Sequence, residues 1–309
     1  MNSIKILGSG VCIPKKEVLN CDLATRFNIS SQYIYERTGI EKRFFVENET
    51  IVNLAINAVN DVFSKIEFDK RKIDLIIVAS TSTNKLMPGI SYLVQKELQI
   101  DKCMCMDILA GCSGYINAFD IARNYITLGK ANYALVIGCE VLSNYIDKND
   151  LGTAIILADG AGATLIGKTE DKKIYDSLLE SNGMKSEILT CTANEKIKMD
   201  GKSVYKFAIT DTVHNVKEIL KNNNLTLNDI KYIVPHQSNI RIIQSIAERL
   251  SVSKEKIYTN ISEVGNTFCA SIPIALNEMI EKGRLQKNDR IILLGYGGGL
   301  NLGSILLEI

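Results

Sequence analysis

The residue with the most distinctive chemical setting is Cys112, in the small-residue segment Ala110-Gly-Cys-Ser-Gly114. This segment lies between a predicted strand over residues 102–109 and a predicted helix from about Ser113 to Leu128. Backbone N–H groups and the helix dipole at such a position favour a thiolate over a thiol. The pattern suits a nucleophile, although taken alone it is more often that of a buried cysteine beside close-packed glycines.

The chain has two histidines, and only one lies where catalytic groups usually lie. His236 follows a predicted strand and Pro235 and leads into a helix start, so it is placed at the carboxyl end of a strand, where α/β sites are built. His214 lies within a predicted helix over residues 211–217, where an exposed or half-buried structural role is expected.

The elements that must position these residues come in two similar sets. Apolar runs of strand length alternate with amphipathic stretches of helical length, which predicts an α/β architecture. Residues 72–79 resemble residues 229–236, and Gly111-Cys-Ser-Gly resembles Gly265-Asn-Thr-Phe, with an offset of roughly 155 residues. Asn266 thus occupies the place in the second half that Cys112 occupies in the first. We infer a duplicated βα unit that points Cys112 and Asn266 toward a common region.

The length agrees with this duplication, because 309 residues correspond to about two domains or one large duplicated one. Apolar periodicity lapses in the polar run at residues 168–173, so we place the join there, with halves at residues 1–168 and 169–309. Each half has a central helix that is expected to end at a glycine, Gly129 or Gly283.

Composition argues against several classes of protein. The chain has 36 Lys and Arg against 35 Asp and Glu, so its formal charge of +1 gives no support to a general nucleic-acid or membrane-surface role. The most apolar segment, residues 151–167, is interrupted by Asp159 and falls short of the ~18 uncharged residues of a membrane span. The N-terminal residues have no signal-peptide pattern, and eight cysteines are too sparse for a disulfide scaffold. A cytoplasmic protein with reduced thiols is expected.

Metal and nucleotide motifs are not matched. Cys103 and Cys105 share one face of a predicted strand, but no histidine or second cysteine pair has zinc-ligand spacing, so core packing is the better interpretation and no metal is expected. Position 196, five residues before Gly201-Lys-Ser, is lysine where a phosphate loop needs glycine.

Seven motifs, taken in order along nearly the whole chain, resemble the β-ketoacyl-ACP synthase III branch of the thiolase superfamily. They are Glu36-Arg-Thr-Gly-Ile40, Ala110-Gly-Cys-Ser-Gly114, Asp159-Gly-Ala-Gly162, Gly201 to Ala208 with Val204-Tyr-Lys-Phe, Pro235-His-Gln-Ser-Asn239, Gly265-Asn-Thr267 with Ser271-Ile-Pro273, and Gly295-Tyr-Gly-Gly-Gly299. The resemblance implies a thiolase-like fold, in which two duplicated βαβ-type halves form a five-layered α/β/α/β/α core, and a homodimer.

The resemblance also implies a catalytic triad of Cys112, His236 and Asn266. An acyl thioester would load Cys112, and malonyl-ACP would then lose CO₂ and condense with the acyl group. The oxyanion hole would consist of the Cys112 and Gly298 N–H groups, while His236 and Asn266 would stabilise the enolate. No cofactor besides the acyl-CoA or acyl-ACP and malonyl-ACP substrates is implied.

Further residues are assigned by the same resemblance. Substrate-binding positions map to Tyr33, Arg37, Met87, Tyr205 and Asn239. Relatives clamp the CoA adenine between a Trp and an Arg, but this chain has no Trp and carries Tyr33 and Leu151 at the matching positions, with Arg37 retained. Met87 matches a position that reaches into the partner subunit's acyl tunnel. Three cations are candidates for docking an acidic acyl carrier protein: Lys206, Arg241 and Arg249.

Two other functions stay open at this point. An acyltransferase or thioester hydrolase of the same fold would keep the acyl-Cys112 intermediate and pass the acyl group to an amine, an alcohol or water. A non-catalytic dimerisation or carrier-binding subunit would be expected to lack Cys112 or His236, and this chain has both. The sequence favours condensation, in fatty-acid initiation or in a specialised polyketide-like pathway.

Overall fold

The first sheet is built entirely from the N-terminal half of the chain. The computed structural model describes residues 3–192 and 195–309. The strand order of the first sheet is β1-β7-β6-β4-β5, in which β4, β5 and β6 are parallel and β7 is antiparallel to both β1 and β6. Its strands are β1 (Ser3–Cys12), β4 (Leu75–Ala79), β5 (Met104–Ile108), β6 (Tyr133–Glu140) and β7 (Gly160–Thr169).

The second sheet repeats this pattern in the C-terminal half. Its order is β11-β12-β13-β8, with β11 parallel to β12 and β13 antiparallel to both β12 and β8. The strands are β8 (Tyr175–Ser181), β11 (Tyr232–Pro235), β12 (Arg290–Gly297) and β13 (Asn301–Glu308). β11 takes the place in this sheet that β4 takes in the first. On the outer side of β11, at the position that corresponds to β5, a single bridge joins Ile233 to Ile257. The duplication inferred from the sequence is therefore confirmed.

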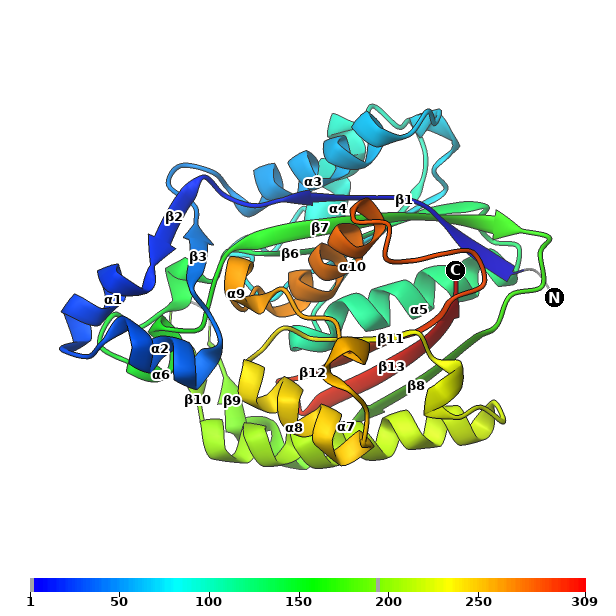
Figure 1. Ribbon diagram of the computed structural model, residues 1–309. Helices are drawn as coiled ribbons and strands as arrows, with labels where there is room; N and C mark the ends of the chain where they lie inside the picture. Colours follow the sequence, from blue (N-terminus) through cyan, green and yellow to red (C-terminus); the bar gives the residue numbers. More distant parts are fainter. Residues whose placement is uncertain (1–2, 193–194) are drawn as a thin grey trace.

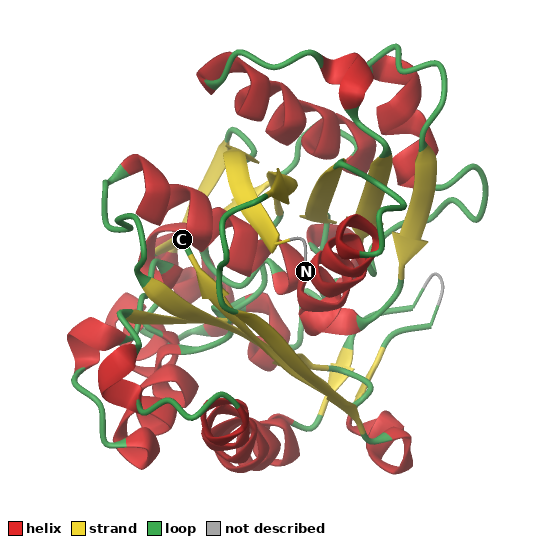
Figure 2. Ribbon diagram, turned by 90° about the vertical axis from the view of Figure 1, so that its right-hand side faces the viewer, coloured by secondary structure: helices red, strands yellow, loops and turns green. Residues whose placement is uncertain are grey.

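Helices form three layers, one between the two sheets and one on the outer face of each sheet, which gives the predicted five-layered α/β/α/β/α arrangement (Figures 1 and 2). Between the sheets lie α5 (Gly114–Thr127) and α10 (Ser271–Glu281). Against the outer face of the first sheet lie α3 (Ile51–Lys65) and α4 (Ile90–Glu97), and against that of the second lie α7 (Gly201–Asn222) and α8 (Ile240–Leu250).

The apolar strands follow from this layering, because a sheet covered on both faces needs apolar side chains on both. In β4, Leu75 and Ile77 pack into the central layer, whereas Ile76 and Val78 pack toward α3 and α4. All five residues of β4 are buried. Successive side chains of a strand alternate between its faces, so one continuous apolar run supplies two separate cores.

The central helices end where the sequence predicted. Gly129 and Gly283 follow α5 and α10 with φ angles of 70° and 62°, a left-handed conformation that glycine adopts without a steric penalty and that commonly ends helices. The join of the halves at residues 168/169 stays a prediction; β7 ends at Thr169 and β8 begins at Tyr175.

Smaller elements surround one end of the two sheets (Figure 1). They comprise β2 (Lys16–Leu19), α1 (Asn20–Phe27), α2 (Ser31–Thr38), β3 (Lys42–Phe45), α6 (Leu151–Ala154), the hairpin of β9 (Leu189–Thr190) and β10 (Lys198–Met199), and α9 (Ile261–Val264). The connecting 3-10 helices are η1 (Lys70–Lys72), η2 (Gly111–Ser113), η3 (Ser143–Tyr145), η4 (Gly183–Ile188), η5 (Leu227–Asp229), η6 (Lys254–Lys256) and η7 (Phe268–Ala270). Within the described ranges, no helix combines the length and apolar character needed to cross a bilayer.

Candidate active site

Cys112 lies in the turn η2, between the end of β5 and the start of α5, as the sequence predicted. Its side chain is buried under the glycine-rich turn that follows β12 in the other half. A Cβ on Gly297 would lie 2.7 Å from the Cys112 sulfur, and a Cβ on Gly111 would lie 2.9 Å from the Gly298 carbonyl oxygen. Glycines are therefore required for the two halves to approach each other this closely around the nucleophile.

Burial opposes the stabilisation of a thiolate that the sequence pattern indicates for Cys112. Burial raises the pKa of Cys112 to about 12, and the nearby Glu140 carboxylate raises it further, while the backbone N–H groups of Gly298 and Cys112 oppose both effects. Removing a thiolate from water disfavours the charged form more than two N–H groups and a helix start can offset. Burial therefore favours the thiol form of Cys112 in the resting protein.

We expect alkylation of Cys112 by iodoacetamide to accelerate about tenfold per pH unit from about pH 7 to about pH 9, because the thiolate is the reactive form and its share grows with pH below the pKa. Peptide mapping assigns the label to Cys112 among the free cysteines of the chain. A rate that levels off near neutral pH would contradict the raised pKa and restore the thiolate interpretation.

His236 lies directly after β11, at the carboxyl end of the strand, and is 1% exposed. Its Nδ1 lies 2.7 Å from the Ser271 Oγ, and the ring of Tyr296 meets the imidazole edge to face at 5.3 Å. Burial lowers the pKa of His236 to about 3, so the ring is neutral at physiological pH. Nε2 has no hydrogen-bond partner within residues 3–192 and 195–309, which leaves this atom for a molecule in the adjoining cavity.

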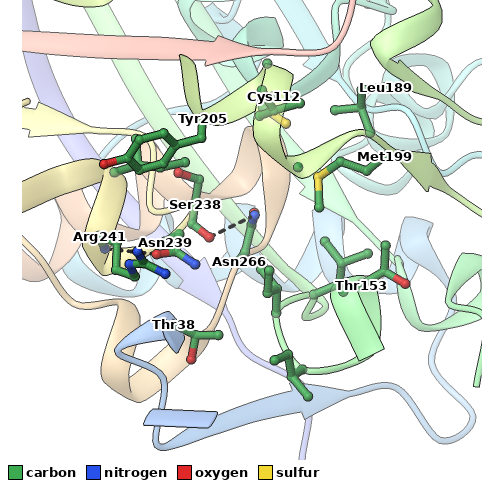
Figure 3. A pocket seen from close by; sticks show the side chains of 18 of the residues that line it. Thr38, Cys112, Thr153, Leu189, Met199, Tyr205, Ser238, Asn239, Arg241 and Asn266 are labelled. Atoms are coloured by element: carbon green, nitrogen blue, oxygen red, sulfur yellow. Dashed lines mark hydrogen bonds between the residues drawn. The ribbon is translucent and has the colours of Figure 1, made fainter. Parts of the chain in front are cut away.

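Asn266 follows α9 and is held by two hydrogen bonds that define the orientation of its amide. Its Oδ1 accepts from the Phe268 backbone N–H at 3.0 Å, and its Nδ2 donates to the Ser238 carbonyl oxygen at 3.3 Å. Figure 3 shows the hydrogen bond from this nitrogen to Ser238, with the Cys112 side chain above Asn266 in the view. Because an amide nitrogen carries two hydrogens, one N–H remains available to a ligand.

A cavity of about 610 Å³ brings the three residues together, and Cys112, His236 and Asn266 all contribute to its wall. A second cavity, of about 620 Å³, begins on the other side of Cys112 and extends past Leu142 and Tyr145. We call them the first and the second cavity. Cys112 is common to both, so the nucleophile stands where two separate spaces meet. The walls also share Leu189, Ile197 and Phe268.

Most of the other predicted binding residues lie around the first cavity. Its lining includes Tyr33, Arg37, Leu151, Tyr205, Asn239 and Arg241. The guanidinium carbon of Arg37 lies 4.8 Å from the centre of the Tyr33 ring, so one face of this ring carries a cation. Asn239 caps α8 through its Oδ1 and donates its Nδ2 to the Arg37 carbonyl oxygen.

Three predicted residues lie elsewhere. Lys206 on α7 and Arg249 on α8 are exposed and do not line the first cavity. Met87 is 80% exposed and lines neither cavity of its own chain. Gly298 lines the second cavity together with Cys112.

The sequence did not single out several residues that the structure places at the site. Lys202, Ser238 and Phe268 line the first cavity. Glu140 is fully buried at the end of β6 and accepts hydrogen bonds from Thr81, Ser82 and Cys269; burial raises its pKa. Ser238 stands inside the motif that carries His236, which was the available signal. Glu140 is far from any motif, so nothing in the sequence pointed to it.

The cysteines other than Cys112 differ in how deeply they are buried. Cys139 and Cys269 are buried, and Cys103 and Cys105 lie on one face of β5 with their sulfurs 3.7 Å apart, as the core interpretation requires. Cys21 and Cys191, however, are exposed, because α1 and the turn after β9 lie on the surface.

A duplicated five-layered fold with a cysteine from one half facing a histidine and an asparagine from the other defines a condensing enzyme of the thiolase class. Family models described as 3-oxoacyl-[acyl-carrier-protein (ACP)] synthase III and as its C-terminal part match residues 106–183 and 220–309. The chain belongs to the β-ketoacyl-ACP synthase III family, which confirms the resemblance found in the sequence.

Similar proteins cover the whole chain. The β-ketoacyl-[acyl-carrier-protein] synthase III of Clostridium novyi (strain NT) is 38% identical, over 100% of this chain and 99% of the relative. The crystal structure of 3-oxoacyl-[acyl-carrier-protein] synthase III from Aquifex aeolicus VF5 is 36% identical, with a TM-score of 0.96 over 100% of both chains. The corresponding enzyme of Thermus thermophilus is 33% identical, with a TM-score of 0.94 over 98% of each chain.

Proposed function

We propose that the protein is an acyltransferase that catalyses the decarboxylative condensation of an acyl thioester with malonyl-ACP through an acyl-Cys112 intermediate, in fatty-acid initiation or in a related polyketide-like pathway. The observation that carries the proposal is the position of Cys112 between two cavities, with His236 and Asn266 in the wall of one of them. An acyl group bound to Cys112 can occupy the second cavity while the malonyl thioester enters through the first.

In the first half-reaction the Cys112 sulfur attacks the thioester carbonyl carbon, and the bond from that carbon to the donor's sulfur breaks. The Cys112 proton leaves with the donor's free thiol, so the step is balanced without a cofactor. Negative charge develops on the carbonyl oxygen, and the N–H groups of Cys112 and Gly298 are our candidates to stabilise it. Loss of one such donor typically costs about 10²–10³ in rate.

In the second half-reaction the malonyl carbon–carbon bond breaks, CO₂ leaves and its electron pair forms the thioester enolate. We assign the stabilisation of the enolate oxygen to the imidazole of His236 and the free amide N–H of Asn266. The enolate carbon then attacks the acyl-Cys112 carbonyl, the bond from that carbon to the Cys112 sulfur breaks, and the released thiolate takes up a proton from water. A neutral imidazole suits this role because burial lowers the pKa of His236 to about 3.

The test is mass analysis of the products formed from malonyl-ACP and a panel of acyl-CoA and acyl-ACP donors. Condensation gives CO₂ and a 3-oxoacyl-ACP that is longer than the donor's acyl group by two carbons. Free acid, or acyl transfer to an added amine or alcohol without CO₂ release, would instead assign the protein to hydrolysis or simple acyl transfer.

We expect an acyl-ACP to load Cys112 with a higher kcat/KM than the CoA thioester of the same acyl group. Tyr33 is smaller than the Trp of relatives and has Arg37 on one face, and Leu151 provides no cation, so the clamp offers less stacking to adenine. Base stacking is worth roughly 1–3 kcal/mol and a cation–π contact about 0.5–2, so CoA binding should be weaker by about tenfold or more. A carrier protein avoids this loss because it docks through surface charge, for which we propose Lys206, Arg241 and Arg249.

A Leu151→Arg substitution checks this argument, because it places an arginine at the clamp position where this chain has leucine. It should improve the use of acyl-CoA selectively and leave acyl-ACP unchanged. Leu128→Arg, at an exposed position at the end of α5 and away from both cavities, is the matched control and should change neither. If the wild-type protein uses acyl-CoA as well as acyl-ACP, the stacking argument fails.

We propose that the protein is a homodimer formed through the free edge of β5. Five apolar side chains on or near this edge are more than a third exposed: Leu86, Met87, Tyr92, Met104 and Leu109. An uncovered strand edge with apolar side chains favours pairing with a second copy, and Met87 would then reach the partner's second cavity.

Met104→Lys should lower the mass measured by sedimentation to that of a monomer, whereas Tyr35→Lys on α2 should not. A monomeric wild-type protein would contradict the proposal.

We place the protein in the cytoplasm, since all eight cysteines are free thiols and such thiols persist in a reducing compartment.

A further inference from the structure

Ser271 is the first residue of α10, and its side chain is fully buried behind His236. Its Oγ lies 2.7 Å from the His236 Nδ1 and 3.3 Å from the backbone nitrogen of Gln237. The hydroxyl therefore touches the catalytic imidazole on the side that faces away from the first cavity.

The hydrogen bonds of this hydroxyl can be assigned by counting donors. The Gln237 N–H can only donate, so Oγ accepts there. A serine hydroxyl carries a single hydrogen, and in the part of the chain that the structure describes His236 Nδ1 is the acceptor within its reach. If Nδ1 carried the ring hydrogen instead, a buried hydroxyl hydrogen would be left without an acceptor, which is unfavourable.

The hydrogen on the imidazole then belongs to the other nitrogen. A neutral imidazole has one N–H, and Nδ1 uses its lone pair to accept from Ser271. Nε2 is thus an N–H donor toward the first cavity, beside the free N–H of Asn266. Two donors, each oriented by hydrogen bonds to neighbouring protein groups, face the place where the enolate oxygen would develop charge.

We infer that Ser271 is a positioning residue that holds His236 as the Nε2–H tautomer, so that His236 acts as a hydrogen-bond donor and not as the base that removes the Cys112 proton. The tautomer follows from the hydrogen bonds alone; its kinetic consequence rests on the proposed condensation. Removing the Ser271 hydroxyl leaves both tautomers accessible, and only one of them can donate to an enolate.

Nitrogen NMR of protein labelled with ¹⁵N in the imidazole rings tests the tautomer directly. The chain has two histidines, and His214 is exposed on α7 beside Glu218, so it provides an internal reference. Wild-type His236 should show the hydrogen on Nε2 between about pH 6 and about pH 8, and Ser271→Ala should show a mixture or the Nδ1–H form. Wild-type protein with the hydrogen on Nδ1, or an unchanged tautomer in Ser271→Ala, would overturn the inference. The wild-type spectrum tests the tautomer of His236 even if the Ser271→Ala variant fails to fold.

Kinetics of the two half-reactions provide the second readout. Ser271→Ala should lower CO₂ release from malonyl-ACP by about tenfold or more and change Cys112 loading by less than about threefold. Ser304→Ala on β13 is the matched control, because it removes a buried serine hydroxyl that has no partner within the described ranges, and it should change neither rate. Equal losses of loading and CO₂ release in Ser271→Ala would show a merely structural role. If wild-type protein releases no CO₂ at all, the proposed function fails while the tautomer measurement stands.

Discussion

Replacing Cys112 with alanine should abolish formation of the covalent acyl-enzyme and, with it, all condensation. Cys112 is the thiol that stands between the two cavities under the Gly297–Gly298 turn. Without a nucleophile the condensation has no acyl intermediate, so the loss should exceed that of any other single substitution. Intact-mass measurement after incubation with an acyl donor, followed by peptide mapping, should find one acyl group on Cys112 in the wild-type protein and none in the variant.

Cys21→Ala is the appropriate control, because Cys21 is an exposed thiol on α1. This variant should load one acyl group as the wild-type protein does. A stoichiometric adduct that persists on Cys112→Ala would show that another residue is the nucleophile.

Replacing either His236 or Asn266 with alanine should slow the second half-reaction far more than the first. His236→Ala and Asn266→Ala should each lower CO₂ release from malonyl-ACP by about 10²–10³, since each removes an N–H that we assign to the developing enolate. Loading of Cys112 should fall far less, because its oxyanion is assigned to the N–H groups of Cys112 and Gly298. The measurement follows ¹⁴C-labelled CO₂ release beside the rate of acyl transfer to Cys112.

His214→Ala is the control for His236→Ala, because the second histidine is exposed on α7 and interacts with Glu218 away from the cavities. It should leave both rates unchanged. Equal loss of loading and decarboxylation in Asn266→Ala would contradict the division of labour between the two pairs of donors.

The fold was predictable because its signals are local and repeated. The apolar run at β4 and its match at β11, the glycines after α5 and α10, and the paired turns that hold Cys112 and Asn266 each follow from short segments. The duplication then placed the two turns together without any knowledge of long-range contacts. The structure confirms that Cys112, His236 and Asn266 share one cavity.

The electrostatics of the site was not predictable in the same way. The pKa of Cys112 depends on burial under Gly297 and Gly298, which lie more than 180 residues away, and on Glu140 at the end of β6. A helix start and flanking glycines are visible in the sequence, but the loss of water around the sulfur is not. Likewise, the contact of Arg37 with Tyr33 is a choice of side-chain conformation that a motif does not specify.

The shared walls of the two cavities limit how such an enzyme can diversify. Leu189 and Ile197, both from the hairpin region over the site, line the space on either side of Cys112. Under the proposed assignment of the second cavity to the acyl group and of the first to the malonyl thioester, a smaller residue at either position would admit a bulkier acyl group and also loosen the fit of the malonyl thioester. Selection for a new acyl group would therefore affect the binding of both substrates. A change of acyl group that leaves malonyl binding intact would have to come from residues that line the second cavity alone, such as Leu142 and Tyr145.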